Sequence, residues 1–191
     1  ADVGVTHYLE SAEMSEDRQL IRALRRGRIA AAEQIYLKYK DDLFAVAISL
    51  VAQTGTAEDC LQDVFVQLVS DGCRVRSNLK GYLLSCVVNQ ARQHFRQCSV
   101  QSNGMAKMPV RKPRTSDPAE ILSERDEIKV VMRAMAKLSP EQREVIALHL
   151  QGDMRFRQIA RMLGMSINTV QSRYRYGMER LRQLLNKKEA I

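Results

Sequence analysis

Tryptophan is absent from this chain of 191 residues, and aromatic side chains make up only 5% of it. The four cysteines include no C-x-x-C pair, and the three histidines do not cluster with them. A structural zinc site normally needs such close pairs, and a disulfide framework is typical of short secreted chains. We therefore expect reduced thiols, no metal site and no cofactor.

Long apolar runs and a targeting segment are also missing. No window approaches the ~20 apolar residues that a membrane span requires. The first residues, ADVGVTHYLESAEMSED, lack a basic region followed by an apolar core. The hydrophobic fraction of 45% is that of a globular chain with one ordinary domain or two small ones. We expect a cytoplasmic protein without direct membrane insertion.

Acidic side chains are missing from one block of the chain. Residues 74–116 hold nine Lys/Arg and no Asp/Glu, and residues 153–188 hold nine against two. In contrast, residues 1–73 hold seven Lys/Arg against twelve Asp/Glu, and residues 117–152 hold five against seven. The net charge of +8 thus comes from two separate basic blocks. This distribution is expected if nucleic acid contacts two places and protein partners contact the rest.

Strand-like alternation is absent, and the apolar residues recur at helical spacing. The spacing predicts helices over 17–26 and 30–52, a third that Thr56 can cap after a break at 54–56, and a fourth over 79–97. Helical spacing returns at Pro118, with Ile128 and Val131 on the apolar face, and Ser139 can begin the next helix with a capping box. The predicted fold is all-α: two small helical domains, 1–97 and 118–191, joined by a flexible linker, 98–117.

The stretch 152–185 has the pattern of a helix-turn-helix. Gly164 permits a sharp turn after a first amphipathic helix, and Ser166 can cap a second helix that begins at Ile167. Ile167, Val170 and Tyr174 take the inward positions of that second helix. Its outer face then carries short polar and guanidinium groups that can contact base edges and phosphates: Asn168, Thr169, Gln171, Ser172, Arg173 and Arg175.

An acidic helix face is predicted in the first domain. Asp59, Gln62 and Asp63 stand at i, i+3 and i+4, so they share one face of a helix, whereas Leu61 and Phe65 point elsewhere. A patch of this kind, in the most acidic part of a basic chain, suits a basic protein partner better than DNA. The alternative is a solvated acidic face without a partner.

Three motifs in order carry a family resemblance: AEDCLQDVF at 57–65, LKGYLLSCVVNQARQHFR at 79–96, and LSPEQREVIALHL at 138–150 followed by the helix-turn-helix. With them the chain resembles a bacterial RNA polymerase sigma factor of the extracytoplasmic-function (ECF) type, in the sigma-70 family. The resemblance covers about 17–97 and 121–185. It implies a non-enzymatic subunit that binds polymerase core, recognises two promoter elements and directs transcription initiation. It also implies an anti-sigma protein as a partner, and no small-molecule substrate.

The resemblance further implies site residues. Core-polymerase binding falls to Asp59, Gln62, Asp63 and Phe65. Binding of the melted promoter element falls to Arg74, Arg76, Lys80, Tyr82, Asn89, Arg92 and Arg96. Upstream-element binding falls to the outer set of the last helix, with Arg155 and Arg157 near the DNA backbone. This chain has Val69 and Tyr82 where the family commonly has tryptophans, so strand opening is expected to use Tyr82, Phe95 or the loop 73–78.

Two other functions are compatible with parts of the pattern. An autonomous helix-turn-helix regulator would need a receiver or ligand-pocket signature, and none is visible in the sequence. An enzyme acting on nucleic acid could use Asp59 and Asp63 as Mg²⁺ ligands, but no third carboxylate stands nearby in sequence. Co-elution with core polymerase and promoter-specific transcripts would favour the sigma factor, and metal-dependent DNA cleavage would favour the enzyme.

Overall fold

The structure, a computed structural model, describes residues 15–70, 78–104 and 122–186, with backbone alone at 98–104 and 122–127. These ranges contain a helix over 15–25 followed by α2 (Ile29–Val51), α3 (Thr54–Ser70), α4 (Leu79–Gly104), α5 (Leu122–Met135), α6 (Pro140–Leu150), α7 (Phe156–Leu163) and α8 (Ile167–Asn186). They contain no strand, and the predicted all-α class is confirmed. No helix in the described ranges has the length and apolar character that crossing a bilayer requires.

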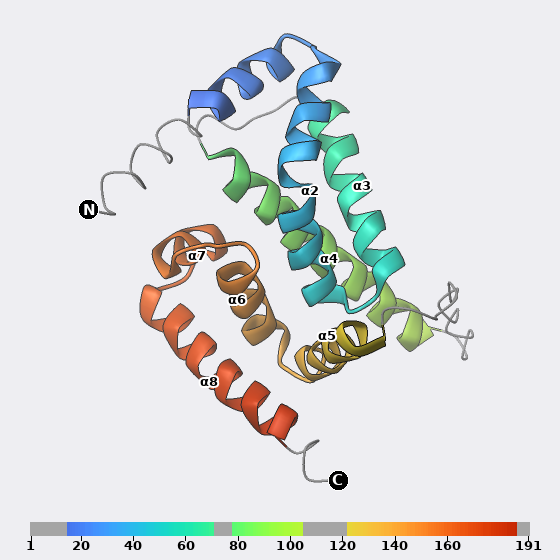
Figure 1. Ribbon diagram of the computed structural model, residues 1–191, viewed down its shortest axis with the longest axis vertical. Coiled ribbons are helices and arrows are strands. Elements are labelled where there is room, and N and C mark those ends of the chain that lie inside the picture. The colour runs from blue at the N-terminus through green and yellow to red at the C-terminus, as the bar shows by residue number, and fades with distance from the viewer. Residues whose placement is uncertain (1–14, 71–77, 105–121, 187–191) are drawn as a thin grey trace.

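The helices α2, α3 and α4 pack against one another as the body of the first domain (Figure 1). The chain reverses between α2 and α3 at Ala52, which adopts the left-handed conformation (φ 58°, ψ 19°) and donates its N–H to the carbonyl of Ile48. The predicted break at 54–56, with Thr56 as the cap, is therefore wrong, because α3 already begins at Thr54. The sequence signal was misleading because glycine usually occupies a left-handed reversal, and here an alanine does.

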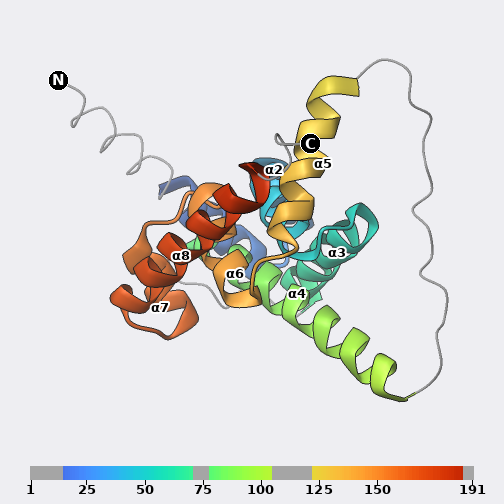
Figure 2. The ribbon, with the colours of Figure 1, turned by 90° about the horizontal axis from the view of Figure 1, so that it is seen from below.

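The helix α4 continues to Gly104 rather than ending at Gln97. Residues 98–104, CSVQSNG, contain no proline, so every residue can donate a backbone N–H to the helix. Figure 2 shows the last turns of α4 extending past the other helices. A helix end that projects in this way needs no apolar face. The low apolar content of residues 98–104 therefore led to the wrong prediction that α4 ends at Gln97.

The helix α6 begins with the predicted capping box. The Ser139 hydroxyl accepts a hydrogen bond from the N–H of Gln142 (3.3 Å), and the Gln142 side-chain oxygen accepts one from the N–H of Ser139 (3.4 Å). Pro140 occupies the first helical turn, where its missing N–H costs nothing. A cap of this kind stabilises a helix by about 1 kcal/mol. It fixes the turn between α5 and α6.

The apolar face of α5 differs from the prediction. Ile128 and Val131, expected to face inward, are 60% and 42% exposed. Among the described side chains of α5, the buried ones are Ala134 and Met135, which pack with α6 and α8. Ile128 and Val131 border an apolar hollow of about 550 Å³, which residues of α2, α6 and α8 complete.

The two domains share one hydrophobic core. Its buried residues come from α2, α3 and α4 and also from α6, α7 and α8. The helix α2 contacts α5 and α6, and α4 contacts α7. The domains also approach closely at Gly152, where an added Cβ would lie 3.2 Å from the side chain of Leu84 and 2.8 Å from the carbonyl of Leu148. The two halves of the chain are therefore packed together as one body.

Candidate nucleic-acid and polymerase interfaces

The helix-turn-helix forms as predicted between α7 and α8. Gly164 ends α7 in the left-handed conformation (φ 67°), and the N–H of Thr169 donates to the Ser166 hydroxyl (3.1 Å) at the start of α8. Val170 is fully buried, but Ile167 is 38% exposed, so its predicted inward position is wrong. Ile167 is the first residue of α8, where no preceding turn of the helix holds it against the core.

Most of the predicted upstream-element residues lie on the surface. Arg155, Arg157, Asn168, Thr169, Gln171 and Arg175 are exposed, and Ser172 and Arg173 are half-buried. Arg175 lies over the ring of Tyr176, with its guanidinium carbon 4.9 Å from the ring centroid. The outer face of α8 thus presents polar side chains and a guanidinium fork that can enter a groove of duplex DNA.

On α8, the side chain of Arg173 is less available to a ligand than that of Arg175. Its Nη1 donates to the sulfur of Met165 at 3.5 Å, which holds the side chain back across the turn. The pKa of Glu141 is lowered, first by its own backbone N–H and the Ser139 hydroxyl, and also by the charges of Arg173 and Arg92. Arg173 therefore lies in the field of a carboxylate, whereas Arg175 faces outward.

An aromatic cluster packs against the inner side of α8. The ring of Tyr174 lies 5.2 Å from that of Phe156 and 5.0 Å from that of His149, and the His149 and Phe156 rings are 4.3 Å apart. The His149 Nδ1 also forms a hydrogen bond with the carbonyl of Met154 (2.8 Å). Tyr174 is thus a packing residue, as predicted from its spacing, and it fixes α8 against α6 and α7.

The residues predicted to bind the melted element differ in how accessible they are. Arg74 and Arg76 lie outside the described residues, and the structure places Asn89 and Arg96 on the exposed surface of α4. Lys80 forms an ion pair with Asp42 of α2 (2.7 Å), and Tyr82 packs half-buried against the core. The structure therefore leaves only part of the predicted set directly open to a ligand.

Arg92 of α4 binds Glu144 of α6 across the domain contact. Its Nε and Nη2 each donate to one carboxylate oxygen at 2.6 Å, and the Glu144 side chain is only 9% exposed. The hydrogen bonds to Glu144 raise the pKa of Arg92, against the opposing effect of burial. A bidentate, charge-assisted pair is the strong form of this interaction. It occupies the guanidinium that the sequence assigned to DNA.

Arg143, adjacent to Glu144, joins three helices through buried hydrogen bonds. Its Nη1 donates to the carbonyl of Leu50 at the end of α2 (2.8 Å), and its other nitrogens donate to carbonyls at the α5–α6 turn: Met135 (3.0 Å), Ala136 (2.7 Å) and Leu138 (3.2 Å). Its guanidinium carbon also lies 5.9 Å from the ring centroid of Phe95 in α4. Burial lowers the pKa of Arg143.

The sequence analysis did not identify Arg143 or Glu144, the two residues of α6 that contact the first domain. One signal was present: Arg143 stands three and four positions before Ile146 and Ala147, so it shares a helix face with buried apolar residues. A charged residue on such a face needs a partner within the fold. Its partners are backbone carbonyls of the α5–α6 turn and of Leu50 in the first domain, and helical spacing does not identify them.

The acidic face of α3 forms as predicted. Asp59, Gln62 and Asp63 are exposed, and burial together with the charges of Asp63 and Asp59 raises the pKa of the Cys60 thiol between them. Phe65 is half-buried, with its ring 5.0 Å from that of Tyr36 in an edge-on arrangement. Phe65 and Gln62 line one surface hollow of about 690 Å³ with other residues of α2 and α3.

Metal ligands do not gather in the part of the chain that the structure describes. No group of three or more His, Cys, Asp or Glu side chains there could hold a metal ion. Asp59 and Asp63 thus stand without a third ligand among the described residues, and what they offer a partner is an exposed negative surface.

Comparison with known proteins finds a family match in each half of the chain. Residues 35–99 match the family described as Sigma-70 region 2, and residues 128–181 match Sigma-70, region 4. The first match contains the acidic face and most of α4, and the second contains the helix-turn-helix. The two matches follow the two domains in order along the chain.

Two sigma factors are similar to this chain over most of its length. The RNA polymerase sigma-E factor of Streptomyces antibioticus is 26% identical over 168 residues, which are 87% of this chain and 91% of that protein. The sigma factor RpoE of Bartonella quintana, solved in complex with the anti-sigma factor NepR, is 28% identical with a TM-score of 0.66 and covers 81% of this chain and 96% of its own.

A further solved structure, CnrH in complex with the cytosolic domain of CnrY, shares the fold at 22% identity. Its TM-score is 0.68, and the match covers 90% of this chain and 97% of CnrH. Sequence and fold thus agree over both domains. The chain belongs to the sigma-70 family as a sigma factor of the ECF type, a non-enzymatic subunit that binds RNA polymerase core and promoter DNA and directs transcription initiation.

Proposed function

We propose that α8 reads the upstream promoter element as duplex DNA and that α4 holds the melted element. The observation that carries this assignment is the exposed outer face of α8, with Asn168, Gln171 and Arg175, on a helix held firmly by the Tyr174 cluster. Side-chain amides and guanidinium groups are the groups that make bidentate contacts with base edges. On α4, Asn89 and Arg96 are exposed in the same manner.

The proposal includes a competition for Arg92. While both of its donors bind Glu144, the guanidinium has little capacity left for a phosphate. Binding of the melted strand along α4 therefore requires α4 to separate from α6. Each half of the chain would then act as its own domain, with the division at 1–97, 98–117 and 118–191 that composition predicts.

Polymerase core is proposed to bind the acidic face of α3. Asp59 and Asp63 supply negative charge, and the neighbouring hollow with Gln62 and Phe65 offers apolar contact. This combination suits a partner helix that is basic and amphipathic. Because polymerase works in the cytoplasm, that is the proposed location of the chain.

An anti-sigma protein is a further proposed partner. The Bartonella quintana relative was solved with such a protein. In this chain the exposed apolar residues Ile128 and Val131, beside the hollow at α5, offer a surface that a protein partner would cover. We expect an anti-sigma protein to compete with core polymerase for the chain.

The test is transcription in vitro with purified core polymerase and a library of genomic promoters. We expect a defined set of transcripts that depends on this chain, and we expect Arg175→Ala to reduce them. Transcripts made equally well by the variant would remove Arg175 from the DNA interface. If the wild-type chain neither bound core nor changed the transcripts, the proposed assignment of its interfaces would have no basis.

A further inference from the structure

Ile167 is an exposed apolar residue at the beginning of α8, and none of the contacts proposed above uses it. Its side chain is 38% exposed, although its spacing from Val170 predicted an inward position. Several other exposed apolar residues border the two hollows described above, beside Phe65 or beside Ile128. Ile167 lines neither of these hollows, so its exposure serves neither of the proposed protein-binding surfaces.

Ile167 shares one ridge of α8 with two residues of the outer face. Gln171 and Arg175 stand four and eight positions after it. Residues four positions apart on a helix differ by only about 40° around its axis. Gln171 and Arg175 are exposed, as Ile167 is. An apolar side chain, an amide and a guanidinium group therefore lie in one row along the surface that we propose to enter the major groove.

The two hydroxyls beside Ile167 bind within the cap of α8. The Ser166 hydroxyl accepts a hydrogen bond from the N–H of Thr169 (3.1 Å), and the hydroxyl oxygens of Ser166 and Thr169 lie 2.8 Å apart. These contacts fix the first turn of α8, in which Ile167 and Asn168 are exposed outside the cap. The first residues of a recognition helix are the ones that contact base edges. Ile167 therefore occupies a position from which a base can be read.

An apolar side chain in the major groove can distinguish thymine from the other bases. Every base edge there carries hydrogen-bonding groups, and only thymine adds a methyl group, at C5. An isoleucine placed against a donor or an acceptor would remove that group from water without replacing its hydrogen bond, which costs free energy. Against the methyl group, the same side chain buries apolar surface of both partners, which is favourable.

We propose that Ile167 contacts the C5 methyl group of a thymine in the upstream promoter element and thereby selects thymine at that position. The inference rests on the proposed function of α8 and deepens it by naming a base. Four residues of helix rise by about 6 Å, and base pairs are spaced by about 3.4 Å, so the thymine should lie within about two base pairs of the base that Gln171 contacts.

The test uses the full chain with core polymerase and the duplex upstream element of one promoter obtained from the transcription library. In separate probes, each thymine of this element is replaced by deoxyuridine, which removes the C5 methyl group and leaves base pairing unchanged. The variants are Ile167→Ala and Ile167→Val, of which the second keeps a branched apolar side chain. Binding of every probe is measured for each variant.

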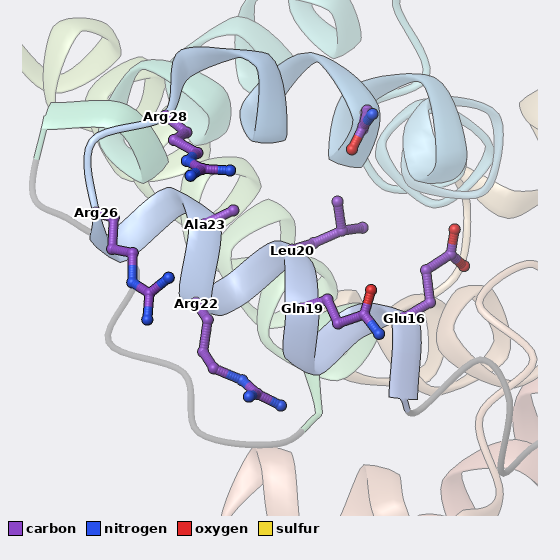
Figure 3. Close-up of a pocket in the computed structure, with 8 residues that line it drawn as sticks. Glu16, Gln19, Leu20, Arg22, Ala23, Arg26 and Arg28 are labelled. Carbon is purple, nitrogen blue, oxygen red and sulfur yellow. The ribbon is translucent and has the colours of Figure 1, made fainter.

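The matched control is Ile29→Ala, which makes the same change at a second exposed isoleucine. Ile29 is the first residue of α2 and follows Arg28, which Figure 3 shows at that end of the helix. Figure 1 shows this end of α2 away from α8. A loss of binding that is specific to Ile167 therefore cannot come from the removal of an exposed apolar side chain as such.

With the wild-type chain, we expect one deoxyuridine probe to bind about threefold to fivefold more weakly than the thymine probe, which corresponds to one buried methyl group. Ile167→Ala should bind the thymine probe more weakly than the wild type and should no longer distinguish it from that deoxyuridine probe. Ile167→Val should keep part of the difference. Ile29→Ala should behave as the wild type with every probe, and all variants should bind core polymerase with unchanged affinity.

Other results would overturn the proposal. If no deoxyuridine probe bound the wild-type chain more weakly, there would be no methyl contact. If Ile167→Ala, with wild-type circular dichroism, still distinguished the same deoxyuridine probe to the same extent, another residue would contact the methyl group. A loss of core affinity in Ile167→Ala would make Ile167 a polymerase contact instead.

Arg175→Ala separates this inference from the proposed function of α8. If Arg175→Ala weakens binding of all probes while Ile167→Ala binds them as the wild type does, α8 still reads the upstream element and only the methyl contact is excluded. If neither variant changes the binding of any probe, the proposed function of α8 fails together with the inference.

Discussion

The two helices that we propose to bind DNA, α8 and α4, differ in how they present their side chains. On α8, Asn168, Gln171 and Arg175 are exposed, and Arg175 contacts only its neighbour Tyr176 among the described residues, through the ring and the hydroxyl (3.3 Å). On α4, Arg92 binds Glu144 of the second domain. The surface proposed to read duplex DNA is therefore exposed, whereas the surface proposed to hold the melted strand is partly occupied by the protein itself.

The difference follows from what each helix packs against. The helix α8 lies at the outside of the molecule, held from one side by the cluster of Tyr174, Phe156 and His149 (Figure 1). The helix α4 lies between the other helices of its domain and α7, which leaves less of its surface to solvent. A helix between two domains presents its full surface only when those domains separate.

Arg143→Met should have the largest effect, because it removes the guanidinium that donates to four backbone carbonyls, three of them in buried hydrogen bonds, and with it the link between α2 and α6. We expect the free energy of unfolding to fall by about 3 kcal/mol, measured by urea denaturation. Arg133→Met, at an exposed position of α5, should change it by less than about 0.5 kcal/mol. Similar values for the two variants would show that the link carries little stability.

Arg175→Ala should weaken binding of the upstream duplex by about 2 kcal/mol, because a guanidinium that contacts a base edge or phosphate is lost. Arg173→Ala should have a smaller effect, since that side chain is held against Met165. The affinity of the polymerase holoenzyme for an upstream-element fragment measures both. A larger loss at Arg173 than at Arg175 would contradict the exposed-face assignment of α8.

Asp63→Arg should weaken core-polymerase binding about tenfold, near 1.4 kcal/mol, because it reverses the charge of the acidic face. Asp41→Arg makes the same charge change at an exposed position of α2 and should leave core affinity unchanged. The affinities can be measured by titration of labelled chain with core, and the difference should shrink at high salt. Equal effects at the two sites would remove α3 from the interface.

Glu144→Gln should have the smallest effect, on the binding of single-stranded DNA. It is also the most specific test of the comparison between α4 and α8. It weakens the pair with Arg92, so binding of a short single-stranded DNA of mixed sequence should tighten by a factor of about three to ten, while duplex binding stays the same. Glu33→Gln, which removes the same charge at an exposed position of α2, is the control. Tighter binding by both variants alike would indicate net charge rather than release of Arg92.

The fold and the outer surfaces were largely predictable from the sequence. Helical spacing, the capping box at Ser139 and the turn at Gly164 are local signals, and the structure confirms them. The acidic face of α3 also follows from spacing alone. These features depend on residues within a few positions of one another, so their spacing in the sequence is enough to predict them.

The remaining features depend on contacts between distant segments. The pairing of Arg92 with Glu144 joins residues 52 positions apart, and that of Arg143 with Leu50 joins residues 93 positions apart. The reversal at Ala52 and the exposure of Ile128 likewise reflect how whole helices pack. The sequence marks these side chains as charged or apolar but does not state which partner each one meets.

The central proposal is that α4 separates from α6 when the melted promoter strand binds along α4. Fluorescent labels at two exposed positions, Gln93 on α4 and Arg182 on α8, would report the separation by energy transfer. We predict high transfer in the free chain and a clear decrease on addition of core polymerase with promoter DNA, with Glu144→Gln shifted toward the lower value before either is added. Unchanged transfer in a holoenzyme that makes promoter-specific transcripts would contradict the account.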